Sequence, residues 1–355
     1  MASNSAATPR KLGYRMPAEW EPHAATWLTW PRRAGASFPG GYDEMSRYWV
    51  RMAALLSRYE DVHVNTFDDE VAAEIREHVA RSREIAGERV FLHPIPAYEP
   101  WCRDHGPIFL TRDAGDRREL AVVDWGYNAW GGKYPPFDLD DAVPRHVALL
   151  LGVPLFEPGI VLEGGSIDVN GRGTLLTTES CLLNPNRNPR LARGEIEQFL
   201  RDYLGVTKIL WLSGGIAGDD TDGHIDDLAR FVNPTTVVTV VEDDASDENF
   251  APLQENLRRL RTMADQSGKP LTVVTLPMPR PKYHEGQRLP ACYANFYIAN
   301  GVVLVPTFDD AADAQAVATL QQLFPDHRIA GVPSLDLIRG LGAIHCVTQQ
   351  QPKVS

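Results

Sequence analysis

One cysteine, one histidine and several carboxylates have residue types and spacings that could do chemistry together. Cys346 lies in residues 340–352, an apolar stretch that begins with two glycines and ends in a polar Thr-Gln-Gln run and a proline. This pattern predicts a thiol at the end of a short buried strand, closely approached by other backbone. A lone cysteine is more often a buried structural residue, so the polar motifs upstream decide between the two interpretations.

His224 lies in the most charged stretch, residues 219–227, which holds five aspartates in nine positions. In a strand, His224 and Asp226 would share one face, which pairs an acid–base group with a carboxylate. The alternating oxygens could instead form a calcium loop, although the terminal glutamate of an EF-hand is absent.

Two further motifs add carboxylates. Asp104 belongs to a Trp-Cys-Arg-Asp-His-Gly-Pro run, which places it beside Trp101 at a turn before an apolar strand. A free aspartate next to a tryptophan would receive a flat cation, whereas the alternative is a turn in which the aspartate caps backbone amides. Glu163 precedes Gly-Gly and follows an apolar run, so we expect a buried carboxylate with a partner or a raised pKa.

A guanidinium is the substrate group that uses all of these side chains. It is planar and carries several N–H donors, so two carboxylates can clamp its edges and leave the central carbon open to a thiolate. Loss of ammonia leaves an amidino-thioether, which water converts to a ureido product. His224 would protonate the ammonia and then deprotonate the water. Because nearby acids raise the pKa of a thiol, we expect the bound cation to supply the field that favours the thiolate.

The composition and net charge of the chain limit the kinds of molecule that it can bind. The chain has 355 residues and a net charge of -12, which disfavours nucleic acid and anionic membranes and favours a small cationic ligand. It has no run of about 18 apolar residues that would predict a membrane span. Residues 1–11 lack the order of a secretory signal and are expected to be a flexible tail, so we expect a cytoplasmic protein. The four cysteines form no CxxC pair, which argues against a zinc ribbon or a disulfide framework.

The elements that must position the chemical groups alternate between strands and helices, which predicts the α/β class. Strands are expected at residues 24–30, 62–67, 90–95, 120–125, 173–178, 208–212, 236–242 and 271–276, with a structural hairpin over 293–306. Helices are expected at residues 43–59, 139–151, 190–204, 249–266 and 311–324, with a shorter one near 70–82. The aromatic, glycine-rich residues 125–134 could line a pocket or pack over the core.

The alternating strands and helices form repeated αβ modules, and a polar, glycine-containing motif recurs once in each module. Asp104 and Glu163 are 59 residues apart (163 minus 104), and Glu163 and His224 are 61 apart (224 minus 163). If similar modules are arranged radially, their equivalent points converge on one centre, as in propeller-like folds. We therefore expect residues 1–355 to form a single domain in which these motifs make one site.

Together the motifs resemble the agmatine deiminase and Porphyromonas-type peptidylarginine deiminase family of guanidino-group-modifying enzymes. The resemblance extends from residues 16–23 through residues 184–189 to residues 344–350. It implies the pentein fold, a five-bladed α/β propeller with pseudo-fivefold symmetry, and no metal or organic cofactor.

Carried over by motif, the resemblance implies a role for each side chain. Cys346 is the nucleophile and His224 the general acid–base, with Glu163 in support of His224. Asp104 and Asp226 clamp the guanidinium.

The implied reaction converts agmatine and water to N-carbamoylputrescine and ammonia, a step of putrescine synthesis. Rival interpretations are a peptidyl- or free-arginine deiminase that makes citrulline, an amidinotransferase, a zinc or calcium hydrolase, and a non-catalytic propeller module that binds guanidinium ligands. Where the family tends to carry Gly-Gly-Gly-Asn and Glu-Thr-Asn, this chain has Gly-Leu-Gly-Ala at 340–343 and Asp-Thr-Asp at 220–222. The sequence leaves the oligomeric state open, and a homo-oligomer is compatible with it.

Overall fold

The computed structural model describes residues 7–82 and 84–354, whose strands form five small sheets and one separate hairpin. The four-stranded sheet contains, in spatial order, β18 (Gln349–Pro352), β1 (His23–Thr29), β2 (Asp61–Asn65) and β3 (Val90–His93). The three-stranded sheets are β4 (Ile108–Ala114), β5 (Arg117–Val123) and β6 (Leu155–Phe156); β7 (Asp168–Val169), β8 (Thr174–Thr178) and β9 (Lys208–Leu212); β10 (Ala229–Asn233), β11 (Thr236–Val241) and β12 (Thr272–Pro277); and β15 (Tyr297–Ala299), β16 (Val302–Thr307) and β17 (Arg328–Pro333). The hairpin is β13 (Tyr283–His284) with β14 (Gln287–Arg288).

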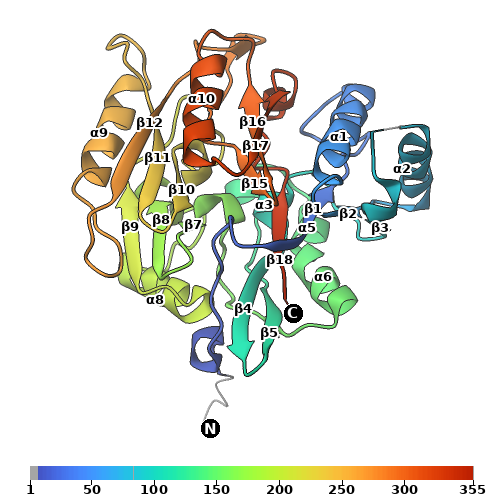
Figure 1. Cartoon of the computed structure of the whole chain (residues 1–355), viewed down its shortest axis with the longest axis horizontal. Coiled ribbons are helices and arrows are strands. Elements are labelled where there is room, and N and C mark those ends of the chain that lie inside the picture. The colour runs from blue at the N-terminus through green and yellow to red at the C-terminus, as the bar shows by residue number, and fades with distance from the viewer. Residues whose placement is uncertain (1–6, 83, 355) are drawn as a thin grey trace.

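The five sheets share one connectivity. In each, β1, β5, β8, β11 or β16 pairs antiparallel with one neighbour and parallel with the strand that follows it along the chain. A parallel pair needs a crossover connection, and one long helix occupies each crossover: α1 (Tyr42–Leu56), α6 (Val143–Leu151), α8 (Arg193–Leu204), α9 (Phe250–Leu260) and α10 (Asp313–Leu323). Figure 1 shows α8 and α9 at the edge of the molecule, outside the strands of their sheets, whereas β2 and β3 extend outward beyond α1.

The core lies between these helices and their sheets. On α9, the buried residues Leu253, Leu257 and Leu260 recur at helical spacing, the stripe that a surface helix presents to a core. Leu253 and Leu260 belong to the same apolar cluster as Val238 and Val240 of β11. The strands β8 and β16 are buried along almost their whole length, which explains why their sequences are continuously apolar or neutral rather than alternating.

A further helix of 13 residues, α2 (Asp69–Arg81), connects the parallel strands β2 and β3. The shorter helices are α3 (Cys102–His105), α4 (Ala129–Gly132), α5 (Asp138–Asp141) and α7 (Glu179–Leu182), with 3-10 helices η1 (Pro9–Leu12), η2 (Gly87–Arg89), η3 (Gly164–Ser166), η4 (Ile225–Asp227) and η5 (Leu337–Gly340). None of the helices in the described ranges is long and apolar enough to cross a bilayer.

The structure confirms the α/β class, the five main helices and the sixth helix near residues 70–82, with shifted ends. The expected helix over 249–266 stops at Leu260, because the chain turns there and Ala264 bridges to Pro270. The expected hairpin over 293–306 forms only from Tyr297 onward, so that the residues before it are an irregular segment.

Two expectations about the chain ends are wrong. The flexible tail was predicted to reach residue 11, but η1 covers Pro9–Leu12, buries Pro9 and contacts α8; residues 1–6 of that prediction lie outside the described residues. Cys346 was placed at the end of a strand, but it lies in the turn before β18. That strand pairs antiparallel with β1, so the first and last strands along the chain lie in one sheet.

Candidate functional site

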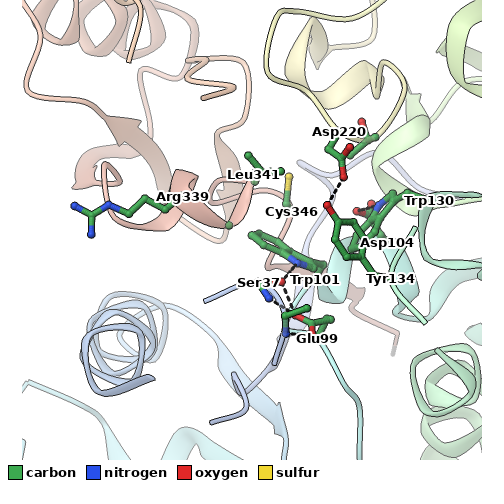
Figure 2. A pocket seen from close by; sticks show the side chains of 14 residues that line it. Ser37, Glu99, Trp101, Asp104, Trp130, Tyr134, Asp220, Arg339, Leu341 and Cys346 are labelled. Carbon is green, nitrogen blue, oxygen red and sulfur yellow. Dashed lines mark hydrogen bonds between the residues drawn. The ribbon is translucent and has the colours of Figure 1, made fainter. Parts of the chain in front are cut away.

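A cavity of about 100 Å³ opens beside Cys346 (Figure 2). Its wall is contributed by five separate stretches of chain, which supply Ala36, Ser37, Glu99, Trp101, Asp104, Trp130, Tyr134, Asp220, Thr221, Arg339, Gly340, Leu341, Gly342 and Cys346. Three of the six predicted site residues, Trp101, Asp104 and Cys346, therefore line the cavity. The other three, Glu163, His224 and Asp226, are fully buried beside it.

The thiol of Cys346 is held among polar groups. Its Sγ lies 3.2 Å from Nδ2 of Asn295 and 3.8 Å from Oδ2 of Asp226. Burial and the carboxylates of Asp226, Asp227 and Asp104 raise the pKa of the thiol well above its ordinary value. In the free protein the sulfur is therefore protonated at neutral pH.

Asp226, Asp104 and His224 meet around Gly165. A methyl group on Gly165 would lie 2.5 Å from Nδ1 of His224, 2.7 Å from Oδ1 of Asp104 and 3.0 Å from Oδ2 of Asp226. Only a residue without Cβ permits this approach, which accounts for the second glycine of the Glu-Gly-Gly motif. Since Oδ2 of Asp226 is also the oxygen near Cys346, the four predicted groups form one cluster.

His224 and Asp226 do not lie on a strand, contrary to the expectation. His224 precedes η4, the 3-10 turn that contains Asp226, so the two side chains converge through a turn rather than through strand alternation. Nδ1 of His224 lies 3.5 Å from Oδ1 of Asp104, and within the described residues neither ring nitrogen has a hydrogen-bond partner. Both nitrogens are thus available to a ligand or a water.

The electrostatics of the cluster differ from group to group. Burial lowers the pKa of His224 to about 3, so the imidazole is neutral. Burial, together with Asp226 and Glu163, raises the pKa of Asp104 well above its ordinary value. Burial acts in the same direction on Asp226, but the hydrogen bond and charge of His345 outweigh it and lower the pKa of that carboxyl.

Asp226 is the carboxylate that stays ionised because His345 holds it. Nδ1 of His345 lies 2.7 Å from Oδ2 of Asp226, and Nε2 lies 2.8 Å from Glu19. Sequence reasoning assigned no role to Glu19 or His345, although both lie in motifs that carry the resemblance.

Glu163 does not hydrogen-bond to His224. Its carboxylate accepts instead from Nε of Arg187, whose Nη1 donates to Asp222 at 2.7 Å. A Glu163 oxygen, a His224 nitrogen and the Cys181 sulfur all lie within 4.8 Å of one another. Burial raises the pKa of Glu163, although Arg187 opposes the shift. The prediction of a buried glutamate with a partner or a raised pKa is met in both respects, and its partner is a residue that sequence reasoning left without a role.

Trp101 forms one wall of the cavity. Its Nε1 donates to Oγ of Ser37 at 2.7 Å, and its ring packs on the backbone of Gly340 and Gly342, where a methyl group would lie 2.9 Å and 2.5 Å from ring carbons. These contacts explain both glycines of the 340–343 stretch. Leu341 between them adopts a left-handed φ of 68°, a conformation that glycine favours.

The aromatic loop at residues 125–134 lines the pocket rather than only covering the core. Nε1 of Trp130 donates to Oδ2 of Asp104 at 3.0 Å. The hydroxyl of Tyr134 donates to Oδ2 of Asp220 at 2.6 Å (Figure 2).

The aspartates of residues 219–227 point to different partners. Asp219 accepts from the backbone and hydroxyl of Thr221, and Asp220 accepts from Tyr134. Asp227 accepts from Asn295, so the segment does not gather its oxygens around one point as a calcium loop would.

Two groups of side chains in the described ranges have the donor spacing that a metal ion requires: Glu163, Cys181 and His224, and Asp226, Asp227 and Cys346. Both fall within the cluster around the cavity. In the first group Glu163 is already engaged by Arg187, and in the second Asp226 is engaged by His345 and Asp227 by Asn295.

Comparison with known proteins gives a consistent result. The family model for Porphyromonas-type peptidyl-arginine deiminase matches residues 15–352. The agmatine deiminase of Pseudomonas aeruginosa (strain LESB58) is 42% identical over 99% of this chain and 98% of its own length.

Two solved structures are similar along nearly the whole chain. An agmatine deiminase of Enterococcus faecalis, described as catalysing its reaction, has a TM-score of 0.89 and 35% identity and covers 98% of each chain. A C. jejuni agmatine deiminase variant with substrate bound has a TM-score of 0.86 and 30% identity and covers 96% of each chain.

Proposed function

Because the chain belongs to the Porphyromonas-type peptidyl-arginine deiminase family, we propose that it hydrolyses a guanidino group through a covalent amidino intermediate on Cys346. The substrate is agmatine, and the products are N-carbamoylputrescine and ammonia, as in putrescine synthesis. The enzyme is thus a hydrolase of C–N bonds in linear amidines. The observation that carries the proposal is a single thiol at the wall of a cavity with Asp104 and Asp226 beside it.

The guanidinium binds between these two carboxylates. Asp226 is already ionised, and the arriving cation favours ionisation of Asp104, whose pKa is raised in the empty site. Trp101 provides a flat wall for the planar group. The same positive charge stabilises the thiolate of Cys346, so the nucleophile forms only when the substrate is present, and the thiol proton passes to His224.

The first half of the reaction releases ammonia. The thiolate attacks the guanidinium carbon and forms a C–S bond. His224 gives its proton to the departing nitrogen, and the C–N bond breaks with its electron pair on ammonia. A positively charged amidino-thioether and a neutral imidazole remain. Glu163, next to His224, supports the imidazole in this step.

The second half restores the enzyme. Water attacks the same carbon, and His224 accepts one of its protons. The C–S bond breaks with its electrons on sulfur, which regenerates the thiolate, and the ureido product forms. The ureido group loses the second proton of the water to solvent, where the ammonia released in the first half takes up a proton as ammonium, so atoms and charges balance without a cofactor or a metal.

The mouth of the cavity favours an amine tail over an amino-acid tail. Asp220 and Glu99 contribute carboxylates to the wall. Arg339 is a cation of the wall, but it pairs with Asp336 at 3.0 Å, and its side chain points away from Cys346 in Figure 2. The carboxylate of free arginine would therefore meet like charges at this end, whereas the ammonium of agmatine would meet opposite ones.

The shared connectivity of the sheets supports a proposal for the whole chain. The five sheets are the blades of a five-bladed α/β propeller with pseudo-fivefold symmetry, and the chain is a single deiminase domain. The net charge of -12 and the four unpaired, buried cysteines support a cytoplasmic enzyme that acts on a small cation rather than on nucleic acid or membranes. For a homo-oligomer, the exposed Leu149 and Leu150 of α6 are candidate contacts.

An ammonia-release assay tests the proposal. It compares agmatine, free arginine and a peptidyl arginine, each with wild type and with Cys346→Ser. We expect the highest kcat/KM with agmatine and a loss of at least about 10³-fold in the variant, since removal of a nucleophile leaves little catalysis. Faster citrulline formation from an arginine substrate would reassign the substrate. A wild type that binds guanidinium compounds without releasing ammonia would favour the non-catalytic module.

A further inference from the structure

We propose that the side-chain amide of Asn295 is a catalytic group that donates a hydrogen bond to Sγ of Cys346 and stabilises the thiolate. The inference rests on the proposed function, in which this sulfur is ionised at the start and at the end of each turnover. Asn295 lies in residues 291–296, an irregular segment before β15, for which the sequence predicted a structural role.

The contacts of Asn295 fix which way its amide faces. Oδ1 accepts from the backbone nitrogen of His345 at 2.9 Å and from that of Cys346 at 3.4 Å. A backbone N–H can only donate, so the atom that faces these two groups must be the carbonyl oxygen. The NH₂ group is then forced to the other side, where Nδ2 lies 3.2 Å from Sγ of Cys346.

Asp227 holds the second hydrogen of the same NH₂ group. Nδ2 lies 2.9 Å from Oδ1 of Asp227, so one hydrogen goes to the carboxyl group and the other is left for the sulfur. Asn295 is completely buried, which prevents water from competing for either hydrogen. One amide thereby fixes the backbone, the side chain and the hydrogen bonding of the nucleophile.

The surroundings of the sulfur explain why such a donor is needed. The acidic side chains that raise the pKa of Cys346 are Asp226, Asp227 and Asp104, and all three oppose the thiolate. The substrate cation counters them only while it is bound, whereas the thiolate released by hydrolysis faces a neutral ureido product. At that stage the N–H of Asn295 still favours the anion. In the thiol form the sulfur can donate instead, since Oδ1 of Asn295 lies 3.6 Å away.

The test is Asn295→Asp, which keeps the shape and the acceptor oxygen but removes the donor. The matched control is Asn256→Asp on α9, also completely buried, whose amide accepts from the backbone nitrogen of Ser213 and donates to the backbone oxygen of Gly214. The control measures the general effect of turning a buried amide into a carboxyl group. Asn295→Ala removes the donor without adding an acid and serves if the aspartate variant does not fold.

Two readouts are needed. The first is the pH dependence of alkylation of Cys346 by neutral iodoacetamide, followed by peptide mass spectrometry, and the second is kcat and KM for agmatine. We expect both Asn295 variants to shift the alkylation profile upward by about one pH unit or more and to lower kcat by about 10²-fold, with KM changed by less than about threefold. The control variant keeps the wild-type profile and kcat.

Unchanged alkylation and kcat in a folded Asn295 variant would overturn the inference. The alkylation readout does not depend on turnover. If the wild type fails to release ammonia from agmatine but the profile still shifts in the variants, the role of Asn295 stands and the proposed substrate falls.

Discussion

At the scale of single residues, the surroundings of Cys346 keep the thiol unreactive until a cationic substrate binds. Burial and three carboxyl groups raise the pKa of Cys346, and burial lowers that of His224 to about 3. The empty site therefore holds a neutral thiol and a neutral imidazole. A bound guanidinium changes the protonation of both the thiol and the imidazole. Its positive charge lies within a few ångströms, where it favours the thiolate and compensates the buried carboxylates.

This arrangement predicts different pH profiles for two alkylating reagents. Neutral iodoacetamide should react with Cys346 only at pH values well above the ordinary cysteine pKa of about 8.5, because the thiolate is scarce below that range. The amidinium reagent 2-chloroacetamidine, which brings its own positive charge, should react already near neutral pH. The measurement is the inactivation rate against pH for each reagent, and coinciding profiles would contradict the account.

The sequence predicted the roles of some single residues of the site and missed those of others. The chemistry of a thiol, a histidine and several acids was readable from residue types, and the structure brings Cys346, His224, Asp104 and Asp226 together. The hydrogen-bonding role of Asn295 was not readable, because its segment is apolar and aromatic and its partner lies 51 residues away. The contact of Arg187 with Glu163 was missed for the same reason, since nothing local marks a pairing made in three dimensions.

At the scale of elements, short turns rather than strands carry the reactive groups. Asp104 lies on α3, Asp226 on η4 and Gly165 on η3, and each of these turns comes just before the first residue of a strand. The strands and crossover helices follow apolar periodicity and were largely predictable. The turns follow close packing between distant segments, which periodicity does not encode, and therefore the strand expected at His224 and Asp226 was wrong.

Gly165→Ala tests the packing of these turns. Its Cβ would overlap Nδ1 of His224 and Oδ1 of Asp104, so both side chains must move, and we expect kcat/KM for agmatine to fall by about 10²-fold. Gly194→Ala in α8, where a Cβ meets nothing within 4 Å, should keep full activity and gain up to about 1 kcal/mol of stability. The measurements are steady-state kinetics and urea unfolding, and equal activity in the two variants would argue against the close approach.

At the scale of the whole molecule, the buried carboxylate of Glu19 contacts residues that are far apart in the sequence. Its carboxylate lies 3.2 Å from Arg103 of α3, 2.9 Å from Arg230 of β10 and 2.8 Å from His345. It also accepts from the backbone nitrogen of Ile298 on β15 at 2.9 Å. Burial opposes its charge, but Arg230, His345 and Arg103 outweigh burial and lower the pKa of Glu19 well below its ordinary value. The repeated αβ modules were predictable from the sequence, whereas this central contact was not.

Glu19→Gln should lower the free energy of unfolding by about 3–5 kcal/mol at pH 7, because it leaves buried cations without their partner. The pKa of Glu19 is depressed in the folded state, so its contribution is present above the unfolded carboxyl pKa of about 4.3 and fades as the pH falls below it. The difference between wild type and variant should therefore shrink in acid. Urea unfolding at several pH values measures it.

The control is Glu255→Gln on α9, whose partners Arg258 and Arg259 lie at the surface of the same helix. Its unfolding midpoint should match that of wild type, since exposed ion pairs contribute little. A Glu19→Gln variant with the same unfolding midpoint as this control would contradict a stabilising role for the buried contacts of Glu19.

The most direct test of the central claim is to trap the intermediate. Enzyme in excess over agmatine is quenched in acid at successive times through one turnover, and the protein is analysed by intact and peptide mass spectrometry. The account predicts a transient adduct on Cys346 with the mass of agmatine less ammonia, which disappears as N-carbamoylputrescine forms. Complete conversion of agmatine with Cys346 unmodified at every time, or an adduct on another residue, would contradict it.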